Sequence, residues 1–186
     1  LVAARHLKAA GQEVVCVMSS DPGRFPPDAA AAWQAWSAQG GQTLGEFLPG
    51  QWALAIDGLF GIGLTRPLEA HTLEWVDRLS ALNCPVLSLD LPSGLDADSG
   101  RVLGRAVRAS HTLTFIALKP GLLTLDGPDH CGEIRIADLD LPASPAPGHV
   151  LTPADFSAAL KPRPRNSHKG CWGDVGILGG APGMVG

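Results

Sequence analysis

Two apolar segments of the sequence end on an aspartate that is followed at once by a glycine-rich or proline-rich turn. The segments are "ALAIDGLFG", with Asp57, and "VLSLDLPSG", with Asp90. Because the carboxyl ends of parallel strands lie at one edge of a sheet, both carboxylates could face the crevice where open α/β sheets bind ligands. Either aspartate alone can also cap a helix or fix a turn. Their occurrence in two corresponding places favours a functional site.

The loop that follows Asp57 is rich in glycine. Its sequence, "GLFGIGLTRP" at 58–67, is neither a phosphate loop, since no Gly-Lys-Ser/Thr follows, nor the GxGxxG pattern of dinucleotide-binding folds. The glycines would let backbone N–H groups approach a phosphate or a ribose, and Arg66 could add positive charge. A plain surface turn, with Pro67 at the entrance of the next helix, explains the same residues equally well.

Lys119 lies directly after a predicted strand, in "FIALKPGLL". A lysine in this position either pairs with a nearby carboxylate or anionic ligand or is simply solvated. The sequence has no GxSxG elbow, CxxC pair or HExxH motif, and we identify no Cys/His pair, so it offers no nucleophile for covalent hydrolysis and no zinc pattern. We expect the four cysteines to be reduced packing residues: Cys16, Cys84, Cys131 and Cys171.

The composition is that of a packed globular protein. Of the 186 residues, 45% are hydrophobic and 17% charged, and the formal net charge is -4. We find no basic stretch with interleaved aromatics, so nucleic acid is not an expected partner. No apolar run approaches the roughly 20 residues that a membrane-spanning helix needs, and no signal peptide opens the chain. We therefore expect no membrane association and a cytoplasmic location.

Strand and helix patterns alternate along the chain. This alternation predicts an α/β fold, a Rossmann-like doubly wound, mostly parallel sheet with helices on both faces. The expected helices are a first one closed by Gly11, a second at 29–41 and a third at Leu68–Leu82. The expected strands are Val14–Met18, one ending at Asp57, Val86–Asp90, 111–118 and one within 132–142.

Prolines mark an expected boundary between two domains. Pro142, Pro145 and Pro147 predict a linker over 143–161, because proline cannot extend a helix or a central strand. We expect 1–142 to be the first domain and 162–186 the beginning of a second, with a short helix near 152–160. The sequence at both ends suggests that the first domain continues upstream of Leu1 and that the second is truncated.

Four motifs, in this order and spacing, resemble the NAD(P)H-hydrate epimerase family, the YjeF N-terminal domain. They are "DGLFGIGLTRPLE", "PVLSLDLPSGLDADSG", "LTFIALKPGLL" and "CGEIRIADLDLP". The later stretch "HKGCWGDVGILGGAPGMVG" resembles the opening of the ADP- or ATP-dependent NAD(P)H-hydrate dehydratase, which has a ribokinase-like fold. The resemblance implies a bifunctional parent protein, with the first strand of a ribokinase-like domain at the end of this chain.

The resemblance also implies a reaction and a set of site residues. The substrate would be NADH or NADPH hydrated at C6 of the nicotinamide ring (NADHX or NADPHX), and the epimerase would interconvert its R and S forms. Asp57 and Ser93 would bind potassium, and Asp90 would contact the hydrated ring and move the proton, with Lys119 as a second catalytic candidate. The nucleotide would be lined by the loop residues Gly61, Ile62, Gly63, Leu64, Thr65, Arg66 and Pro67.

Other functions remain open at this point. The chain could be a non-catalytic binding or scaffold module, since a relative of this family binds an apolipoprotein. An ordinary NAD-dependent dehydrogenase is disfavoured by the missing GxGxxG and the absence of a His or Tyr donor in the strand-end loops. The resemblance favours a homodimer or higher homo-oligomer. It further implies an Asn/Gly-rich phosphate-binding and potassium-binding loop directly before Leu1. The choice between NADHX and NADPHX, and between ADP and ATP, is left open.

Overall fold

The computed structural model describes residues 1–186 except 19, 48–49, 143–147, 160–161, 175 and 177–186. The chain divides into two units, Leu1–Ala143 and Ser144–Gly186. The first strand of a second domain is predicted within 173–186, and most of this stretch, residues 175 and 177–186, lies outside the described residues. The assignment of 143–161 as a linker and of 162–186 as the beginning of a ribokinase-like domain stays a prediction.

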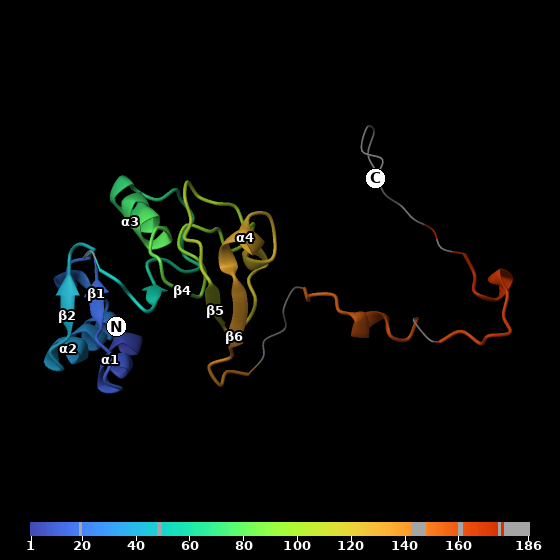
Figure 1. Ribbon diagram of the computed structural model, residues 1–186, viewed down its shortest axis with the longest axis horizontal. Helices are drawn as coiled ribbons and strands as arrows, with labels where there is room; N and C mark the ends of the chain where they lie inside the picture. The colour runs from blue at the N-terminus through green and yellow to red at the C-terminus, as the bar shows by residue number, and fades with distance from the viewer. Residues whose placement is uncertain (19, 48–49, 143–147, 160–161, 175, 177–186) are drawn as a thin grey trace. The chain divides into compact units, whose positions relative to one another are not determined.

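The first unit is an α/β fold with two parallel sheets (Figure 1). Strands β1 (Val15–Val17) and β2 (Gln42–Leu44) form one pair, and a second sheet has the order β3-β4-β5-β6. The strands of this second sheet are Ala55–Asp57, Val86–Leu89, His111–Phe115 and Glu133–Ala137. Every pairing between these six strands is parallel, as the alternation of strands and helices predicts.

The strand order of the larger sheet is compatible with one half of a doubly wound sheet. Strands β3 to β6 follow one another in chain order, so each connection steps in the same direction and the order does not reverse. Within the described residues, β1 and β2 pair separately from these four strands. A single doubly wound sheet with helices on both faces stays a prediction.

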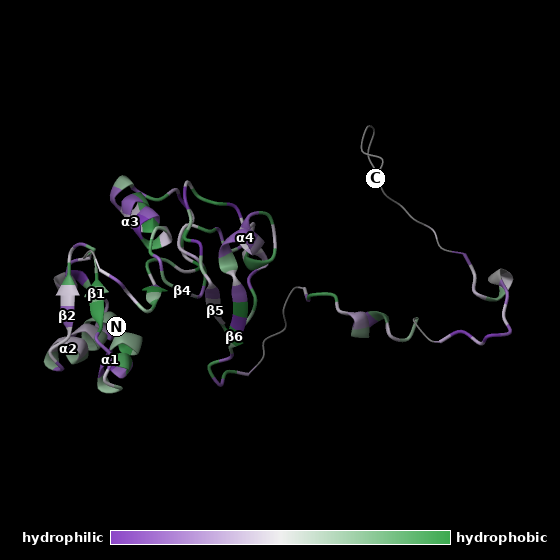
Figure 2. Cartoon of the chain, viewed as in Figure 1, coloured by the Kyte–Doolittle hydropathy of each residue, from purple (hydrophilic) through white to green (hydrophobic). Residues whose placement is uncertain are grey.

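Of the helices in the described residues, α2 and α3 bury large apolar side chains. The helices are α1 (Val2–Ala9), α2 (Pro27–Ala38), α3 (Ala70–Ser80) and α4 (Gly127–Cys131). In α3, Trp75, Val76 and Leu79 are buried, and Val76 and Leu79 join a core cluster with Val86 of β4. The polar residues of α3 give its purple stripes in Figure 2. In α2, Trp36 is fully buried, and its indole N–H donates to Thr43 Oγ1 at 3.0 Å, which ties α2 to β2.

Three single-turn 3₁₀ helices and one slightly longer one complete the described elements. Two lie in the first unit, Pro22–Arg24 and Pro120–Leu122. The second unit contains Pro153–Phe156, where a short helix is predicted, and Lys169–Cys171. None of the helices in the described part of the chain combines the length and apolar character that crossing a membrane requires.

The second unit also contains a cysteine–histidine contact that the sequence did not reveal. Cys171 Sγ lies 3.3 Å from His168 Nε2, although we expected no such pair. Both residues belong to or flank one exposed turn, so their contact is local and a pattern search for catalytic motifs does not find it. All four cysteines are free, as predicted.

Candidate active site

Asp57 is buried at the carboxyl end of β3 and accepts four hydrogen bonds. Its Oδ2 accepts from Ser88 Oγ at 2.8 Å and from the Ser93 N–H at 2.9 Å. Its Oδ1 accepts from Ser93 Oγ at 2.6 Å and from the Leu59 N–H at 3.3 Å. Ser88 reaches Asp57 because the two residues are register partners in the β3–β4 pair. This single carboxylate therefore joins β3, β4 and the loops after both strands.

Ser93 is the second buried residue of this network. Its hydroxyl donates to Asp57 and accepts from the Phe60 N–H at 3.0 Å, so it links the loop after β4 to the glycine loop. All four partners of Asp57 are uncharged donors, so its negative charge is hydrogen-bonded but not neutralised by them. Buried carboxylate and hydroxyl oxygens together are the donor types that a hard cation prefers.

Asp90 and Lys119 form an ion pair at the carboxyl ends of the neighbouring strands β4 and β5. Lys119 Nζ lies 2.5 Å from Asp90 Oδ1, and each side chain is 17% exposed. The ammonium also donates to Thr114 Oγ1 at 2.9 Å and to the Phe115 carbonyl at 2.7 Å. Of the two alternatives that the sequence left open, Lys119 is thus paired with a carboxylate and not simply solvated.

Both strands of this pair end in a tight turn with an unusual backbone. Asp90 has φ 71° and Ile116 has φ 69°, in the left-handed region that non-glycine residues seldom occupy. At Asp90, the Leu91 N–H donates to the Leu89 carbonyl at 3.0 Å, which closes a three-residue γ-turn, and an equivalent bond of 2.8 Å spans Ile116. Such strained backbone is concentrated at functional sites in proteins. At Asp90, this backbone conformation turns the chain away from the direction of β4.

The two oxygens of Asp90 have different surroundings. Oδ1 accepts from Lys119 and, at 3.3 Å each, from Thr114 Oγ1 and the Phe115 N–H. No donor of the described residues is hydrogen-bonded to Oδ2. A Cβ added at Gly61 would lie 3.3 Å from Oδ2, so this oxygen faces the glycine loop where the loop carries no side chain. The site thus offers one anchored and one accessible carboxylate oxygen.

The remaining loop residues of the predicted nucleotide site are spread over different environments. Gly63, Thr65 and Pro67 are exposed, as is Ile62, whose exposed fraction is 61%. Arg66 points into solvent with an 80% exposed side chain and lies 3.7 Å from Glu69. Leu64 is buried in the core against α3. Leu64, Arg66 and Pro67 line a small hollow of about 220 Å³ beside α3, together with Phe60, Leu68, Glu69 and Thr72.

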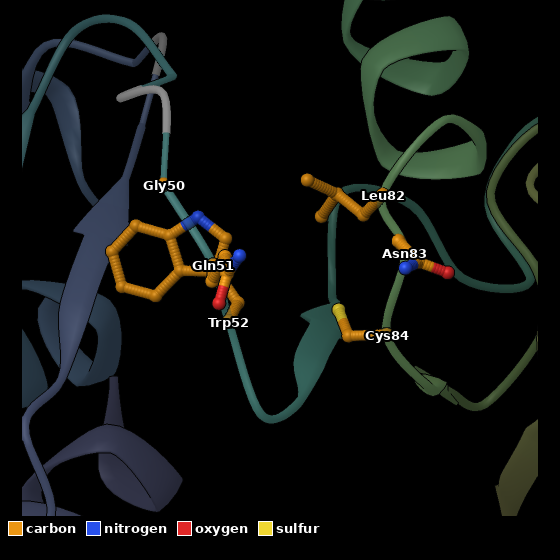
Figure 3. Close-up of a pocket in the computed structure, with 6 residues that line it drawn as sticks. All are labelled: Gly50, Gln51, Trp52, Leu82, Asn83 and Cys84. Atoms are coloured by element: carbon orange, nitrogen blue, oxygen red, sulfur yellow. The ribbon is translucent and has the colours of Figure 1, made fainter.

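A larger hollow of about 310 Å³ lies at the other end of the strands (Figure 3). Trp52 and Gln51, which precede β3, line one side of it, and Leu82, Asn83 and Cys84, which precede β4, line the other. These residues come before their strands, whereas Asp57 and Asp90 come at the strand ends. The hollow is therefore separate from the aspartate site, and its size alone does not mark the reactive centre.

The loop after Ser93 stabilises itself. Gly94 has φ 99°, a conformation that glycine adopts without strain. Asp96 Oδ1 accepts from the Ser99 N–H at 2.8 Å and from Ser99 Oγ at 2.6 Å, and these bonds lower the pKa of the Asp96 carboxyl. Asp96 is therefore a turn-forming residue.

Sequence reasoning missed two residues of the site, Ser88 and Thr114. Both are fully buried hydroxyl residues within strands. The only signal in the sequence is the alternation of "HTLTF", which places Thr112 and Thr114 on the same face of β5. Threonine is common in strands, so this alternation does not indicate a site by itself.

Comparison with known proteins places this chain among close relatives. A family described as YjeF-related protein N-terminus matches residues 1–121. The NAD(P)H-hydrate epimerases of Bordetella pertussis and Achromobacter xylosoxidans are 43% and 46% identical over 166 and 161 residues. These alignments cover 87% and 83% of this chain and 68% and 72% of the two relatives.

Two further proteins show similarity over a smaller share of their own length. The bifunctional NAD(P)H-hydrate repair enzyme Nnr of Escherichia coli is 36% identical over 192 residues, all of this chain and 37% of that enzyme. The crystal structure of yeast ynu0 matches with a TM-score of 0.63 at 18% identity, over 75% of this chain and 60% of that one, which supports the fold. On the match to residues 1–121 and the identity to these relatives, the chain belongs to the YjeF-related N-terminal family.

Proposed function

We propose that the protein is an NAD(P)H-hydrate epimerase, which interconverts the R and S forms of hydrated NADH and NADPH. The observation that carries this proposal is the Asp90 carboxylate, with Oδ1 anchored by Lys119 and Oδ2 accessible beside Gly61. Relatives with 43% and 46% identity carry the name of this enzyme. A group that first gives and then takes one proton is what inversion at C6 requires.

The proposed reaction exchanges water at C6 of the reduced ring. The cycle starts with a proton on Asp90 Oδ2, while Oδ1 keeps its bond to Lys119. The ring nitrogen donates its lone pair as the C6–O bond breaks, and the Oδ2 proton passes to the departing hydroxyl, which leaves as water. Water then adds to C6 from the opposite face, the C6–N double bond returns its electrons to nitrogen, and Oδ2 takes the proton that this water loses. Atoms and charges balance over the cycle, because the carboxyl group is restored and one water leaves as another adds.

Lys119 has a separate proposed task at the other oxygen. Its ammonium donates to Oδ1, to the Thr114 hydroxyl and to the Phe115 carbonyl, so all three of its protons are in use. It therefore holds the carboxylate by charge and direction while Oδ2 handles the proton. We further propose that the loop 61–67 contacts the nucleotide, with backbone N–H groups and Arg66 directed to its phosphates.

We propose that Asp57 and Ser93 hold a potassium ion. The donor types fit, because the buried Asp57 charge is matched only by uncharged donors and both residues present oxygen. Each Asp57 oxygen accepts two hydrogen bonds, so the ion would compete with one of these donors, of which the Leu59 N–H at 3.3 Å is the most distant. When bound, the ion would supply positive charge next to the anionic substrate.

The test follows the ratio of R to S NADHX by chromatography after one epimer has been enriched. The natural full-length protein is compared with Asp90→Asn, which keeps the size of the side chain, and with Asp98→Asn, an exposed carboxylate in the same loop. We expect the Asp90 variant to fold and bind but to lose turnover by about 10³-fold, the usual scale of general acid–base catalysis. Turnover should be unchanged in the Asp98 variant.

Two outcomes would contradict the proposal. Unchanged turnover of Asp90→Asn would remove this carboxylate from the mechanism. No equilibration by the folded wild-type protein would favour the alternative of a non-catalytic binding module.

We also propose a second activity for the protein to which residues 144–186 belong. The Escherichia coli repair enzyme aligns with all of this chain, and its name is that of a bifunctional enzyme. This name supports a second activity. We propose that a following dehydratase domain, which uses ADP or ATP, supplies it, as the resemblance of residues 168–186 implies. The homodimer and the cytoplasmic location stay predictions.

A further inference from the structure

The Thr114 hydroxyl lies between the two charged groups of the site. Thr114 is fully buried in β5, and its Oγ1 is 2.9 Å from Lys119 Nζ and 3.3 Å from Asp90 Oδ1. The register of the sheet brings it there. Leu89 pairs with Leu113, and the next residues along the chain are Asp90, directly after β4, and Thr114, within β5. The proposed epimerisation assigns no task to this hydroxyl.

The direction of each hydrogen bond around Thr114 follows from the number of protons available. An ammonium can only donate, so Thr114 Oγ1 must accept from Lys119. The single hydroxyl proton is then free to point at Asp90 Oδ1, which carries no proton and can only accept. The chain of donors therefore runs from Lys119 through Thr114 to Asp90.

With these directions, three donors bind one oxygen of the Asp90 carboxylate. Oδ1 accepts from Lys119, from the Thr114 hydroxyl and from the Phe115 N–H. The donors are a lysine ammonium, a strand hydroxyl and a backbone N–H, and rotation of the Asp90 carboxylate about its terminal bond would move Oδ1 away from all three. Oδ2 then stays beside Gly61. Without the hydroxyl, the Lys119 ammonium would keep two acceptors, and Oδ1 would lose its only side-chain donor besides that ammonium.

We propose that Thr114 is a positioning residue of the epimerisation, whose hydroxyl orients the Asp90–Lys119 pair so that Oδ2 is the oxygen that exchanges the proton. This inference rests on the proposed function and deepens it. Thr114 does not contact the substrate in this account; it acts through Asp90. Its contribution appears in the turnover step more than in substrate binding.

The same strand supplies a matched control. Thr112 is also buried, with 1% of its surface exposed, and lies on the same face of β5. Its hydroxyl donates to the Cys131 carbonyl at 2.7 Å, a purely structural contact that joins β5 to the end of α4. Removal of the Thr112 hydroxyl costs one hydrogen bond and removal of the Thr114 hydroxyl costs two, but only the bonds of Thr114 involve the charged pair.

The experiment measures kcat and KM for equilibration of enriched R-NADHX by Thr114→Val, Thr114→Ser and Thr112→Val in the natural full-length protein. Valine keeps the shape and removes the hydroxyl, whereas serine keeps the hydroxyl. We expect kcat of Thr114→Val to fall about tenfold or more, as for loss of a hydrogen bond to a charged group, with KM changed less than threefold. Thr114→Ser should retain kcat within about threefold, and Thr112→Val within about twofold.

Several results would overturn the inference. One is a Thr114→Val variant that keeps kcat within twofold of the wild type, and another is an equal loss in Thr112→Val, which would indicate a general effect of buried hydroxyls in this strand. If Thr114→Val does not fold by circular dichroism, Thr114→Cys, with its weaker donor, takes its place under the same criteria. An inactive wild type would overturn this inference and the proposed function together, whereas an active wild type with an unaffected Thr114→Val overturns this inference alone.

Discussion

Gly61→Ala tests whether Asp90 Oδ2 is the reacting oxygen. A Cβ at position 61 would lie 3.3 Å from Oδ2 and 3.8 Å from the Asp90 Cβ. Gly61 does not have a positive φ, so alanine does not strain the backbone there. The usual effect of Gly→Ala on the unfolded chain is stabilisation by about 0.4–1 kcal/mol. We therefore expect the free energy of unfolding to change by less than about 1 kcal/mol.

The effect on the reaction follows from the space around Oδ2. A hydroxyl or water hydrogen-bonded to Oδ2 lies about 2.7 Å from it. The new methyl carbon would lie 3.3 Å from Oδ2, and the oxygen of the bound partner must stay at least about 3.4 Å, an ordinary contact, from that carbon. At Oδ2, the direction to the partner must therefore differ from the direction to the methyl carbon by about 70° or more. This closes a large part of the accessible side of the oxygen. We expect kcat/KM to fall about hundredfold, about 2.7 kcal/mol, the lower end of general acid–base catalysis.

The assay is the equilibration of R and S NADHX, together with urea unfolding of the same preparations. Gly58→Ala is the matched control, because it lies in the same loop and its Cβ would make only an ordinary contact of 3.6 Å with Leu89. We expect this control to keep kcat/KM within about twofold. If kcat/KM of Gly61→Ala stays within threefold of the wild type, Oδ2 is not the reacting oxygen on its Gly61 side, since the proton then reaches Asp90 by another approach.

The remaining predictions concern the buried network and the thiols. Ser93→Ala should lower the free energy of unfolding by about 3 kcal/mol in urea titrations. The substitution removes a buried hydrogen bond to the Asp57 carboxylate and leaves the Phe60 N–H without its acceptor. A change below about 1 kcal/mol would show that the network reorganises. Burial raises the pKa of the Cys131 thiol to about 11, so at pH 8 it stays protonated. Iodoacetamide should then label exposed Cys171 quickly and Cys131 only after unfolding, as peptide mass mapping would detect; equal rates in the native protein would contradict this.

The strand ends of the site could be predicted from the sequence alone. Apolar runs that end on Asp57 and Asp90 are strong local signals, and the parallel pairing of β3 with β4 follows from the helix between them. The carboxyl ends of these strands then have to lie at one edge. The roles of Asp57 and Ser93 as a potassium site and of loop 61–67 as a nucleotide site came from family resemblance and stay predictions.

Features that depend on tertiary contacts could not be predicted. Lys119 is 29 residues from Asp90, and only the register of β4 and β5 brings the two together. Strand β2 was not predicted because its three residues, "QTL", are largely polar and half of the usual strand length, whereas the apolar β1 is green in Figure 2. The partners of Asp57 could not be predicted either, since a serine in a strand does not reveal which side chain it contacts.

The unequal oxygens of Asp90 constrain how a substrate ring can lie in the site. In the proposed reaction, the departing and the arriving water are on opposite faces of a nearly planar ring, yet only Oδ2 is accessible for proton exchange. A single oxygen placed above one face would be shielded by the ring from the other face. It can serve both faces only when it lies near the ring plane, next to C6. The nicotinamide ring must therefore meet Asp90 edge-on, and a crystal structure with a bound nicotinamide nucleotide would show the ring plane directed at Oδ2.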